Sequence, residues 1–505
     1  MSDDRRFGAP VIDDRRPGAD PGDDRPGQLL FPPLPHRIAE RAAAALADPQ
    51  LQRFVNAATR LKDATRERVR DATFGADAAA LRAYAGRIKQ HTLDQLDVYL
   101  ERFVAAATAR GTRVHCASDA EEARAICLDI AARAGARRCV KAKSMATEEI
   151  RLLDALERAG VATVETDLGE YILQLDHDAP SHIVTPMIHK DRTAVGRAFA
   201  RELGVAYTDD PAALTSIARR ELREAFHLAD LAVTGGNFLV AEDGAVVLCT
   251  NEGNGRMCAT WPRVRVAVVG IEKLVPDRAS LAVMLDLLAR TSTGQPLTVY
   301  TSIVAGPRQP GEPDGPEELH VVLLDNGRSD ILADPSFRDA LRCIRCGACL
   351  NACPVYRKIG GHAYGGVYPG PIGAVITPLL RGVDAYPDLP HATSLCGACH
   401  AACPVDIDLP RMLVALRKGQ LARRQIGWRE RLLHRLWAWG MRGRWRYRLG
   451  AWLLRRFLRG RADARGFVTR LPGPGRGWTD VRSLPAPAAR PFRSCWRRLR
   501  RRRRS

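Results

Sequence analysis

The sequence predicts a mixed α/β protein with N-terminal helices, followed by a helical cysteine-rich module and a basic helical tail. Three observations predict this organisation. Apolar residues recur at helical spacing between residues 36 and 110, and short apolar runs alternate with helical segments between about 111 and 330. Farther along, seven cysteines fall in two closely spaced runs. We therefore expect five parts, which are 1–30, 31–110, 111–330, 331–420 and 421–505.

The first part, residues 1–30, repeats a short acidic and basic motif that begins at Asp3, Asp13 and Asp23. Proline, glycine and mixed charges dominate it, which predicts a disordered lead-in. It contains no apolar stretch of the kind that a secretion signal needs, and no run of about 18 apolar residues occurs in the chain. We therefore expect a cytoplasmic protein, and peripheral contact with the inner face of the membrane is considered below.

The second part, residues 31–110, predicts helices that serve as a scaffold or a partner surface. Apolar side chains lie three or four positions apart in two stretches, beginning at Ile38 and at Leu93. The third part, residues 111–330, predicts an α/β domain with a largely parallel, buried sheet. The runs predicted as strands are Val114–Cys116, Cys139–Lys141, Val161–Val164, Ile172–Leu175, His182–Val184, Leu231–Val233, Val246–Leu248, Val264–Val269, Leu297–Val304 and His320–Leu324. Helices are predicted at Ala120–Ala134, which Gly135 ends, and at Glu148–Arg158.

Functional loops of such sheets lie beyond the carboxyl ends of the strands. The loops predicted there are 141–149, 165–171, 185–190, 234–238 and 250–256. Lys141, Lys143 and Ser144 follow a strand and suit contact with an anionic group, and the Thr234–Asn237 segment offers two glycines for a tight turn. The sequence contains neither a dinucleotide-binding glycine motif nor a P-loop, so we predict no nicotinamide site and no P-loop phosphate site.

The fourth part, residues 331–420, contains the two cysteine runs. Cys343, Cys346, Cys349 and Cys353 have the spacing C-x2-C-x2-C-x3-C, and Pro354 follows. This is the bacterial ferredoxin spacing for cubic iron–sulfur clusters, in which the fourth cysteine binds the other cluster. The second run keeps only three cysteines, Cys396, Cys399 and Cys403, before Pro404.

The sequence therefore predicts two linked [4Fe–4S] clusters with crossed ligands. The first cluster is predicted to bind Cys343, Cys346, Cys349 and Cys403, and the second Cys353, Cys396 and Cys399. Thr393 stands where the second run would have its first cysteine. Its missing ligand is left open among His391, His400, Cys495, water and a partner's side chain, and a [3Fe–4S] cluster is an alternative. Zinc is the rival metal, but zinc sites need only four ligands.

The other cysteines lack such spacing. Five lie in or near apolar runs and are predicted to be core thiols, namely Cys116, Cys127, Cys139, Cys249 and Cys258. Cys495 lies among arginines and is predicted to be exposed.

The fifth part, residues 421–505, carries the charge of the chain. It contains 26 Arg, no Lys and 3 acidic residues, so its formal charge is +23 and the other 420 residues sum to −3 against a total of +20. Seven of the eight tryptophans also lie there. Arginine with Trp and Leu at helical spacing over residues 428–460 favours contact with an anionic membrane surface or a partner subunit. Nucleic acid is the less favoured partner, because no nucleic-acid module accompanies the tail.

Several motifs together resemble the lactate-utilisation protein B family. They are CIRCGACLNACPVY, SLCGACHAACPV, KAKSMATEEI, ETDLGEYILQL, PSHIVTPMIHK and LAVTGGNFLVAEDGAVVLCTNEGN, and the likeness runs from about residue 30 to 420. The closing segment Trp478–Trp496 is also similar to the ending of that family. The resemblance implies a NagB/RpiA/CoA-transferase-like α/β domain over about residues 70–300, two clusters, and electron transfer within a three-protein complex that oxidises L-lactate to pyruvate.

Two other functions are kept as alternatives. One is a scaffold or regulator that bears clusters and binds nucleic acid through its basic tail. The other is an acyl-CoA-transferase-like enzyme, because the segment 250–256 faintly resembles the loop of such enzymes and would make Glu252 the nucleophile. The sequence does not identify the residues that contact lactate, the electron acceptor or the oligomeric state.

Overall fold

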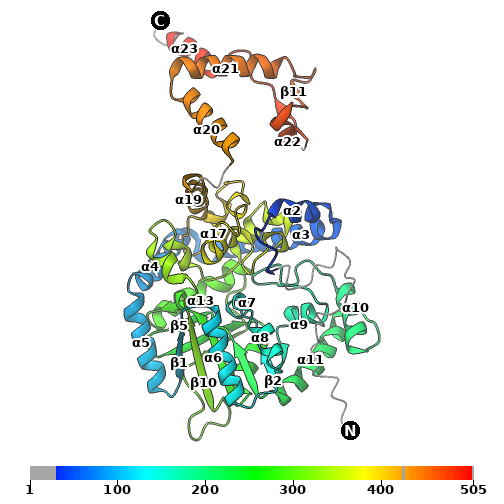
Figure 1. The fold of residues 1–505 in the computed structure, drawn as a ribbon, viewed down its shortest axis with the longest axis vertical. Helices are drawn as coiled ribbons and strands as arrows, with labels where there is room; N and C mark the ends of the chain where they lie inside the picture. Colours follow the sequence, from blue (N-terminus) through cyan, green and yellow to red (C-terminus); the bar gives the residue numbers. More distant parts are fainter. Residues whose placement is uncertain (1–29, 424–426, 481, 503–505) are drawn as a thin grey trace. The chain divides into compact units, whose positions relative to one another are not determined.

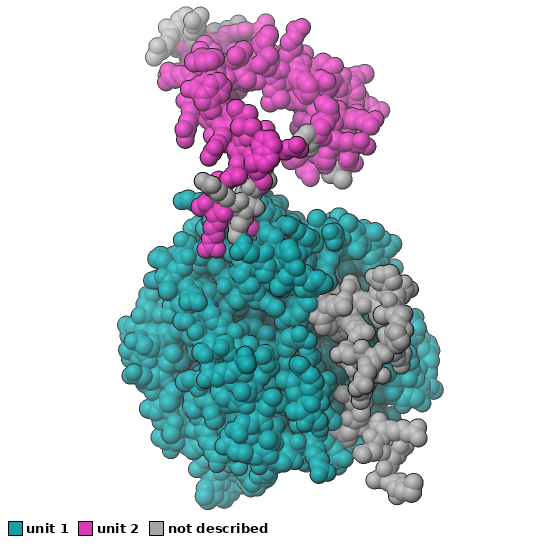
Figure 2. All heavy atoms as spheres, in the orientation of Figure 1, with its two compact units in different colours: residues 1–419 teal, residues 420–505 magenta. Residues whose placement is uncertain are grey.

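The computed structural model describes residues 30–423, 427–480 and 482–502, so the acidic and basic repeat near the N-terminus lies outside the described residues. The chain divides into two compact units, one ending at Gly419 and one comprising Gln420–Ser505 (Figure 2). The first unit holds the sheets and both cysteine runs. It is a mixed α/β structure with a parallel sheet and many helices.

Four helices open the first unit, as predicted between residues 36 and 110. They are α2 (Ile38–Ala47), α3 (Pro49–Phe74), α4 (Ala78–Asp94) and α5 (Leu96–Ala109). Helix α3 begins where Asp48 accepts hydrogen bonds from the amides of Gln50 and Leu51 at 2.8 and 3.1 Å, with proline at its first position. Buried residues of α3 and α4, such as Val55 and Ala85, join the same apolar core as the cysteine runs.

The main sheet has six parallel strands in the order β1-β10-β7-β4-β2-β3 (Figure 1). Their bounds are β1 Arg113–Ala117, β2 Arg138–Lys141, β3 Ala162–Glu165, β4 Leu231–Thr234, β7 Val264–Gly270 and β10 Glu318–Leu324. Every residue of the central strands β4 and β7 is buried, which confirms the predicted parallel, buried sheet. Helix α6 (Ala120–Arg133) packs on β1 and β10 and is followed by Gly135 at a φ of 61°.

A second sheet, which the sequence did not predict, has the order β8-β5-β6-β9. Its strands are β5 (Phe238–Val240), β6 (Ala245–Thr250), β8 (Leu274–Val275) and β9 (Tyr300–Val304). Its buried residues Leu239 and Val246 pack with Val269 of the main sheet. Helix α13 (Arg278–Ser292) covers β5 and β8 and connects this sheet to the cysteine-bearing core.

Two predicted strands are wrong. Residues Ile172–Leu175 belong to helix α9 (Leu168–Leu175), whose first turn is capped because Asp167 accepts a hydrogen bond from the Glu170 amide at 3.2 Å. The segment His182–Val184 forms no strand, because the His182 ring nitrogen Nδ1 accepts the amides of Val184 and Thr185 at 3.0 and 3.2 Å.

The helix predicted over 148–158 is two helices. They are α7 (Met145–Glu149) and α8 (Leu152–Arg158), and the break lies at Arg151, which has a φ of 52°. The other helices before the cysteine runs are α10 (Arg192–Leu203), α11 (Pro211–Leu228), α12 (Asn254–Thr260) and α14 (Arg328–Ala333).

The cysteine-bearing segment is built from short helices. They are α15 (Ala348–Ala352), α16 (Tyr356–Ile359), α17 (Gly370–Arg381), α18 (Ala398–Ala402) and α19 (Leu409–Ala422). Helices α15 and α16 pack against α3, and α15 packs against α18. Tyr356, Val375 and Met412 are wholly buried in a core shared with α3, α4 and α13. The segment is therefore continuous with the rest of the first unit.

The second unit contains α20 (Trp428–Met441), α21 (Arg444–Arg459), α22 (Arg476–Thr479), α23 (Phe492–Arg502) and a two-stranded antiparallel pair, β11 (Phe467–Val468) with β12 (Leu484–Pro485). Large apolar side chains of α20 and α21 are exposed, among them Trp437, Trp445 and Leu453. Across the described ranges, no helix is both long and apolar enough to cross a membrane.

Candidate functional site

The two cysteine runs have the same backbone conformation. Arg345 and Leu395 precede the aligned Cys346 and Cys396 and have φ values of 60° and 53°. The following glycines, Gly347 and Gly397, have φ values of 75° and 82° and begin helices α15 and α18. Non-glycine residues rarely adopt a positive φ, so its recurrence at equivalent positions shows that both runs form the same kind of loop.

Backbone amides point at cysteine sulfurs in both runs. The Arg345 amide donates to Cys343 Sγ at 3.4 Å, and the Tyr356 amide donates to Cys353 Sγ at 3.5 Å. In the second run the Ile407 amide donates to Cys403 Sγ at 3.4 Å. Hydrogen bonds to sulfur stabilise the thiolate form, which is the form that binds iron. The residues present therefore fit an iron–sulfur cluster.

The first predicted ligand set lies together and is mostly buried. Burial raises the pKa of the Cys349 thiol well above its ordinary value, and the nearby Cys343, Cys346, Cys399 and Cys403 raise it further, in that order. Burial raises the pKa of Cys403 to about 12, with added effects of Cys346 and Cys343. Four neighbouring thiolates in an apolar core repel one another, so they need a bound cation such as iron to be ionised together.

The second predicted set also lies together, but it reaches the surface. Burial raises the pKa of Cys399 to about 12, and Cys353 and Cys396 raise it further. Cys396 is exposed, and its pKa is lowered by a hydrogen bond with the Ser394 side chain and then by the Ala398 amide. The two sets therefore differ in their access to solvent.

Thr393 takes the place of a cysteine in the second run. Its Oγ1 accepts the Leu395 amide at 3.0 Å, as Cys343 Sγ accepts the Arg345 amide in the first run. Of the other candidate ligands, His400 contacts Asp406 Oδ1 through Nε2 at 3.1 Å, and His391 ends a short 3-10 helix two residues before Thr393. Cys495 is exposed, as predicted, and belongs to the second unit.

The remaining cysteines are mainly core thiols. Cys127, Cys139 and Cys258 are buried, and Cys249 is half-buried. The prediction for Cys116 was wrong, because it lies on β1 at the edge of the main sheet and is exposed.

The five loops predicted to carry function meet at one cavity of about 380 Å³. Each contributes to its lining, through Lys143, Asp167, Thr185, Gly235 and Glu252 among others. The cavity lies beyond the carboxyl ends of β2, β4 and β7, where ligands bind in open α/β sheets. Its far wall is formed by the first cysteine run, through Arg345 and Cys346.

Ionic groups that the sequence did not single out surround the first cysteine run. Arg328 is buried and binds Glu149 through two hydrogen bonds of 2.9 Å each and Glu272 at 2.6 Å. Arg345 Nη2 lies 3.3 Å from Glu272, and Lys89 Nζ donates to the backbone oxygens of Glu272 and Leu274 at 2.6 and 2.8 Å. Three basic groups therefore face two carboxylates, so this region has an excess of positive charge next to Cys343.

The glycines of the Thr234–Asn237 segment, which were predicted to permit a tight turn, have a different structural role. Neither has a positive φ. A Cβ on Gly235 would lie 2.6 Å from Ser144 Oγ, and one on Gly236 would lie 2.9 Å from a methyl carbon of Val269. Glycine is needed here because the cavity floor is packed tightly.

Glu252 lines the cavity, and no basic side chain in the described part of the chain is hydrogen-bonded to its carboxylate. It accepts the Leu168 amide at 3.1 Å, and burial and then the charge of Asp167 raise its pKa. A nucleophilic carboxylate must be ionised, and the raised pKa of Glu252 disfavours that form, so the site does not favour acyl transfer there.

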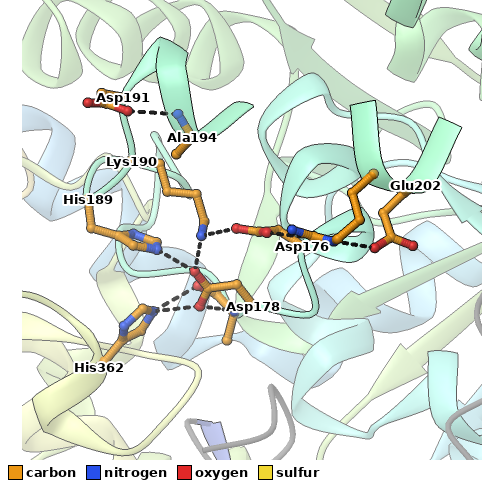
Figure 3. A network of polar contacts seen from close by, with 10 residues as sticks. Asp176, Asp178, His189, Lys190, Asp191, Ala194, Glu202 and His362 are labelled. Carbon is orange, nitrogen blue, oxygen red and sulfur yellow. Dashed lines mark hydrogen bonds and ion pairs between the residues drawn. The ribbon is translucent and has the colours of Figure 1, made fainter. Parts of the chain in front are cut away.

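A polar network joins the loop after α9 to the segment between the cysteine runs (Figure 3). Asp178 contacts His189 Nε2 at 2.8 Å and Lys190 Nζ at 2.6 Å, and His362 Nε2 lies 2.8 Å from the Ala179 oxygen. Asp178, His189 and His362 are close enough to hold a metal ion, but Lys190 already neutralises Asp178. We interpret the network as a structural contact that holds these two segments of the first unit together.

Three family models match the chain. The LUD domain matches residues 100–324, the 4Fe-4S dicluster domain matches residues 339–407, and the C-terminal region of lactate utilisation protein B matches residues 417–501. Among solved structures, a DUF162 family protein from Deinococcus radiodurans aligns at 15% identity over 46% of this chain and 98% of its own, with a TM-score of 0.27. That TM-score is too low to establish a shared fold.

Curated relatives match most of the chain. Lactate utilization protein B of Shouchella clausii is 45% identical over 417 residues, which is 82% of this chain and 86% of the relative. The proteins of that name from Bacillus cereus (strain B4264) and Bacillus thuringiensis (strain Al Hakam) are also 45% identical, over 81% of this chain and 86% of their own lengths. With this identity over most of both chains, the protein belongs to the lactate utilisation protein B family.

Proposed function

We propose that this protein is the iron–sulfur electron-transfer subunit of a complex that oxidises L-lactate to pyruvate. The observation that carries the proposal is the grouping of the seven cysteines into two neighbouring sets, each with amides directed at sulfur. The name of the curated relatives supports lactate as the electron source. The oxidation releases two electrons and two protons, and two clusters that each accept one electron can hold both electrons.

The proposed ligands follow the crossed arrangement. Cys343, Cys346, Cys349 and Cys403 would hold one [4Fe–4S] cluster. Cys353, Cys396 and Cys399 would hold the other, either as [4Fe–4S] with one ligand that is not cysteine or as [3Fe–4S]. Because only the second set has an exposed cysteine, we propose that electrons leave the protein there, toward a quinone or another carrier.

The parts of the chain keep their predicted assignments as proposals. Residues 111–330 would form a NagB/RpiA/CoA-transferase-like domain, and residues 331–420 the two-cluster module. Other lactate-utilisation subunits would be the partners. The chain would be cytoplasmic, with contact to the inner face of the membrane through 428–460.

The membrane contact is supported by exposed side chains of the second unit. Trp437, Trp445 and Trp452 are exposed on helices that also carry arginine, a combination that suits the interface of anionic lipid. The full chain should float with phosphatidylglycerol vesicles and not with phosphatidylcholine vesicles. Absence of flotation with both, together with retention on DNA, would support the nucleic-acid alternative instead.

Growth on L-lactate tests the function. A strain that lacks this gene should grow on L-lactate when it carries the wild-type chain, and should fail with Cys349→Ser or Cys399→Ser. Glu252→Gln tests the acyl-transfer alternative, and normal growth of that variant would exclude acyl transfer at that residue. Full growth with both cysteine variants would contradict the proposed electron-transfer role.

A further inference from the structure

The cavity beside the first cysteine run has no part in the electron path described above. Its volume of about 380 Å³ falls within the range of small-molecule sites, which is roughly 300–1,000 Å³. It extends from the strand ends of the main sheet to Cys346. A molecule bound in it would therefore lie against the first proposed cluster.

Three buried polar atoms in the cavity lining have no hydrogen-bond partner among the described residues. They are Lys143 Nζ, Arg345 Nη1 and Ser292 Oγ, and the Ser292 side chain is 6% exposed. All three can donate a hydrogen bond. A buried donor without a partner costs free energy, and a buried cation without one costs more. A ligand that accepts hydrogen bonds and carries negative charge would remove this cost.

A fourth group, Lys273, adds to the positive charge of the wall. It lines the cavity and forms no ion pair with the residues that the structure describes. Burial, and then the charge of Arg345, lower its pKa to about 8. The charges of Glu272 and Cys343 offset this shift only in part, and a bound anion would offset it further.

The carboxylates of the cavity do not supply that anion. Glu272 is occupied by Arg328 and Arg345. Asp167 caps helix α9, and Glu252 accepts the Leu168 amide. Among the described residues, Lys143 and Lys273 form no ion pair with these three carboxylates, so an anionic ligand would provide each lysine with a partner.

The remaining lining suits a short carbon chain. Met145, Ile183 and Leu248 are apolar and face the same cavity as the three donors. The hydroxyl of Ser292 can either donate to or accept from an oxygen on the neighbouring carbon of a carboxylic acid. The volume leaves room for bound water beside a three-carbon acid, because water takes up about 30 Å³ in the liquid.

We propose that this cavity binds a small 2-hydroxy or 2-oxo carboxylate, with its carboxylate at Lys143, Lys273 and Arg345 and its second oxygen at Ser292. The inference rests on the proposed function only for the natural identity of the acid. It places the acid next to the cluster held by Cys346, so the buried cluster would be the one nearer the substrate and the exposed cluster the one nearer the acceptor.

Equilibrium binding to the anaerobically prepared full chain tests the site. Titration calorimetry with pyruvate and with L-lactate should show one site per chain, and lactamide, which lacks the carboxylate, should not bind. Lys143→Gln and Lys273→Gln should each weaken pyruvate binding by about tenfold or more, because each removes a charge-assisted hydrogen bond. Lys418→Gln is the matched control, since Lys418 is exposed on α19 and does not line the cavity.

Ser292→Ala provides an independent measurement. It should reduce the preference for L-lactate over propanoate, which lacks the hydroxyl, and leave propanoate binding unchanged. Iron content and circular dichroism identify variants that fail to fold. Absence of pyruvate binding to the wild-type chain would overturn the inference. So would pyruvate binding by both lysine variants as tight as that of the wild type. Either result would leave the electron-transfer proposal standing, which depends on the clusters and on growth.

Discussion

Thr393 takes in the second cysteine run the position that Cys343 takes in the first. Each side chain accepts the amide of the residue two positions later, at 3.0 Å to Thr393 Oγ1 and at 3.4 Å to Cys343 Sγ. The backbone around both has the same positive φ pattern. The second run therefore keeps the shape of a complete ligand loop while lacking one sulfur.

Thr393→Cys should complete the second cluster, because the backbone already presents this position as it presents Cys343. The variant should contain about eight irons per chain and show two [4Fe–4S] clusters. Iron analysis and electron paramagnetic resonance after anaerobic preparation measure this. The reverse exchange, Cys343→Thr, is the control and should make the first site a three-cysteine site. Identical iron content and spectra in Thr393→Cys and the wild type would contradict the expectation.

Crossed ligation predicts which variants share a spectrum. Cys403→Ser should perturb the same cluster as Cys343→Ser. The charge of Cys343 raises the pKa of Cys403, which indicates that the two sulfurs lie near each other. Cys353→Ser should match Cys396→Ser for the same reason. Paramagnetic resonance of the reduced variants distinguishes the pairs. If Cys403→Ser instead matches Cys399→Ser, each run binds its own cluster and the assignment is wrong.

Arg328→Leu should destabilise the first unit strongly. The change leaves Glu149 and Glu272 buried without their main partner, which costs about 3–5 kcal/mol in comparable buried pairs. The denaturant midpoint of unfolding measures the effect. Arg133→Leu is the control, because its ion pair with Asp129 is exposed and such pairs contribute at most about 1 kcal/mol. Equal midpoints for the two variants would show that the buried network is not stabilising.

Glu148 and Glu170 should make stability fall as pH rises. Burial, and then a neighbouring carboxyl, raise the pKa of each to about 8 from an ordinary value of 4.5. Between these values the folded chain holds protons that the unfolded chain has lost, so each group lowers the free energy of unfolding by up to about 1.4 kcal/mol per pH unit. Below pH 4.5 and above pH 8 this dependence ends.

The variant Glu170→Gln tests the pH dependence, because a neutral amide replaces the carboxyl. Its thermal midpoint should fall less than that of the wild type between pH 5.5 and pH 7.5, in the window given by the raised pKa of Glu170. Glu101→Gln, at an exposed position on α5, should follow the wild-type curve. Parallel curves for Glu170→Gln and the wild type would mean that this carboxyl is already ionised in the folded chain.

The main sheet could be predicted because its strands are continuous apolar runs separated by helices. The second sheet could not be predicted, because β5 and β8 have only three and two residues. Such short strands are stabilised by tertiary packing and not by a local sequence pattern. Helix α9 was mistaken for a strand although Asp167 and Glu170 have the spacing of a helix-capping pair. That signal was present in the sequence and outweighs the apolar run that follows it.

The candidate site, like the fold, could be predicted from the sequence only in part. Spacing predicted two loops of the same kind, and the shared backbone conformation of both runs agrees with it, while the assignment of each sulfur to a cluster stays a prediction. The cations around the first run could not be predicted, since Lys89, Lys273 and Arg328 are distant in sequence. They meet only through the packing of α4, the short 3-10 turn before β8, and α14. The cavity was anticipated as a set of loops, but its wall at Arg345 required the structure.

The reduction of the clusters by L-lactate tests the central proposal most directly. The full chain, purified anaerobically with its lactate-utilisation subunits, is mixed with L-lactate and frozen for paramagnetic resonance. Signals from reduced clusters are expected, and Cys349→Ser and Cys399→Ser should each remove one of them. Clusters that dithionite reduces but L-lactate leaves oxidised would contradict the proposal.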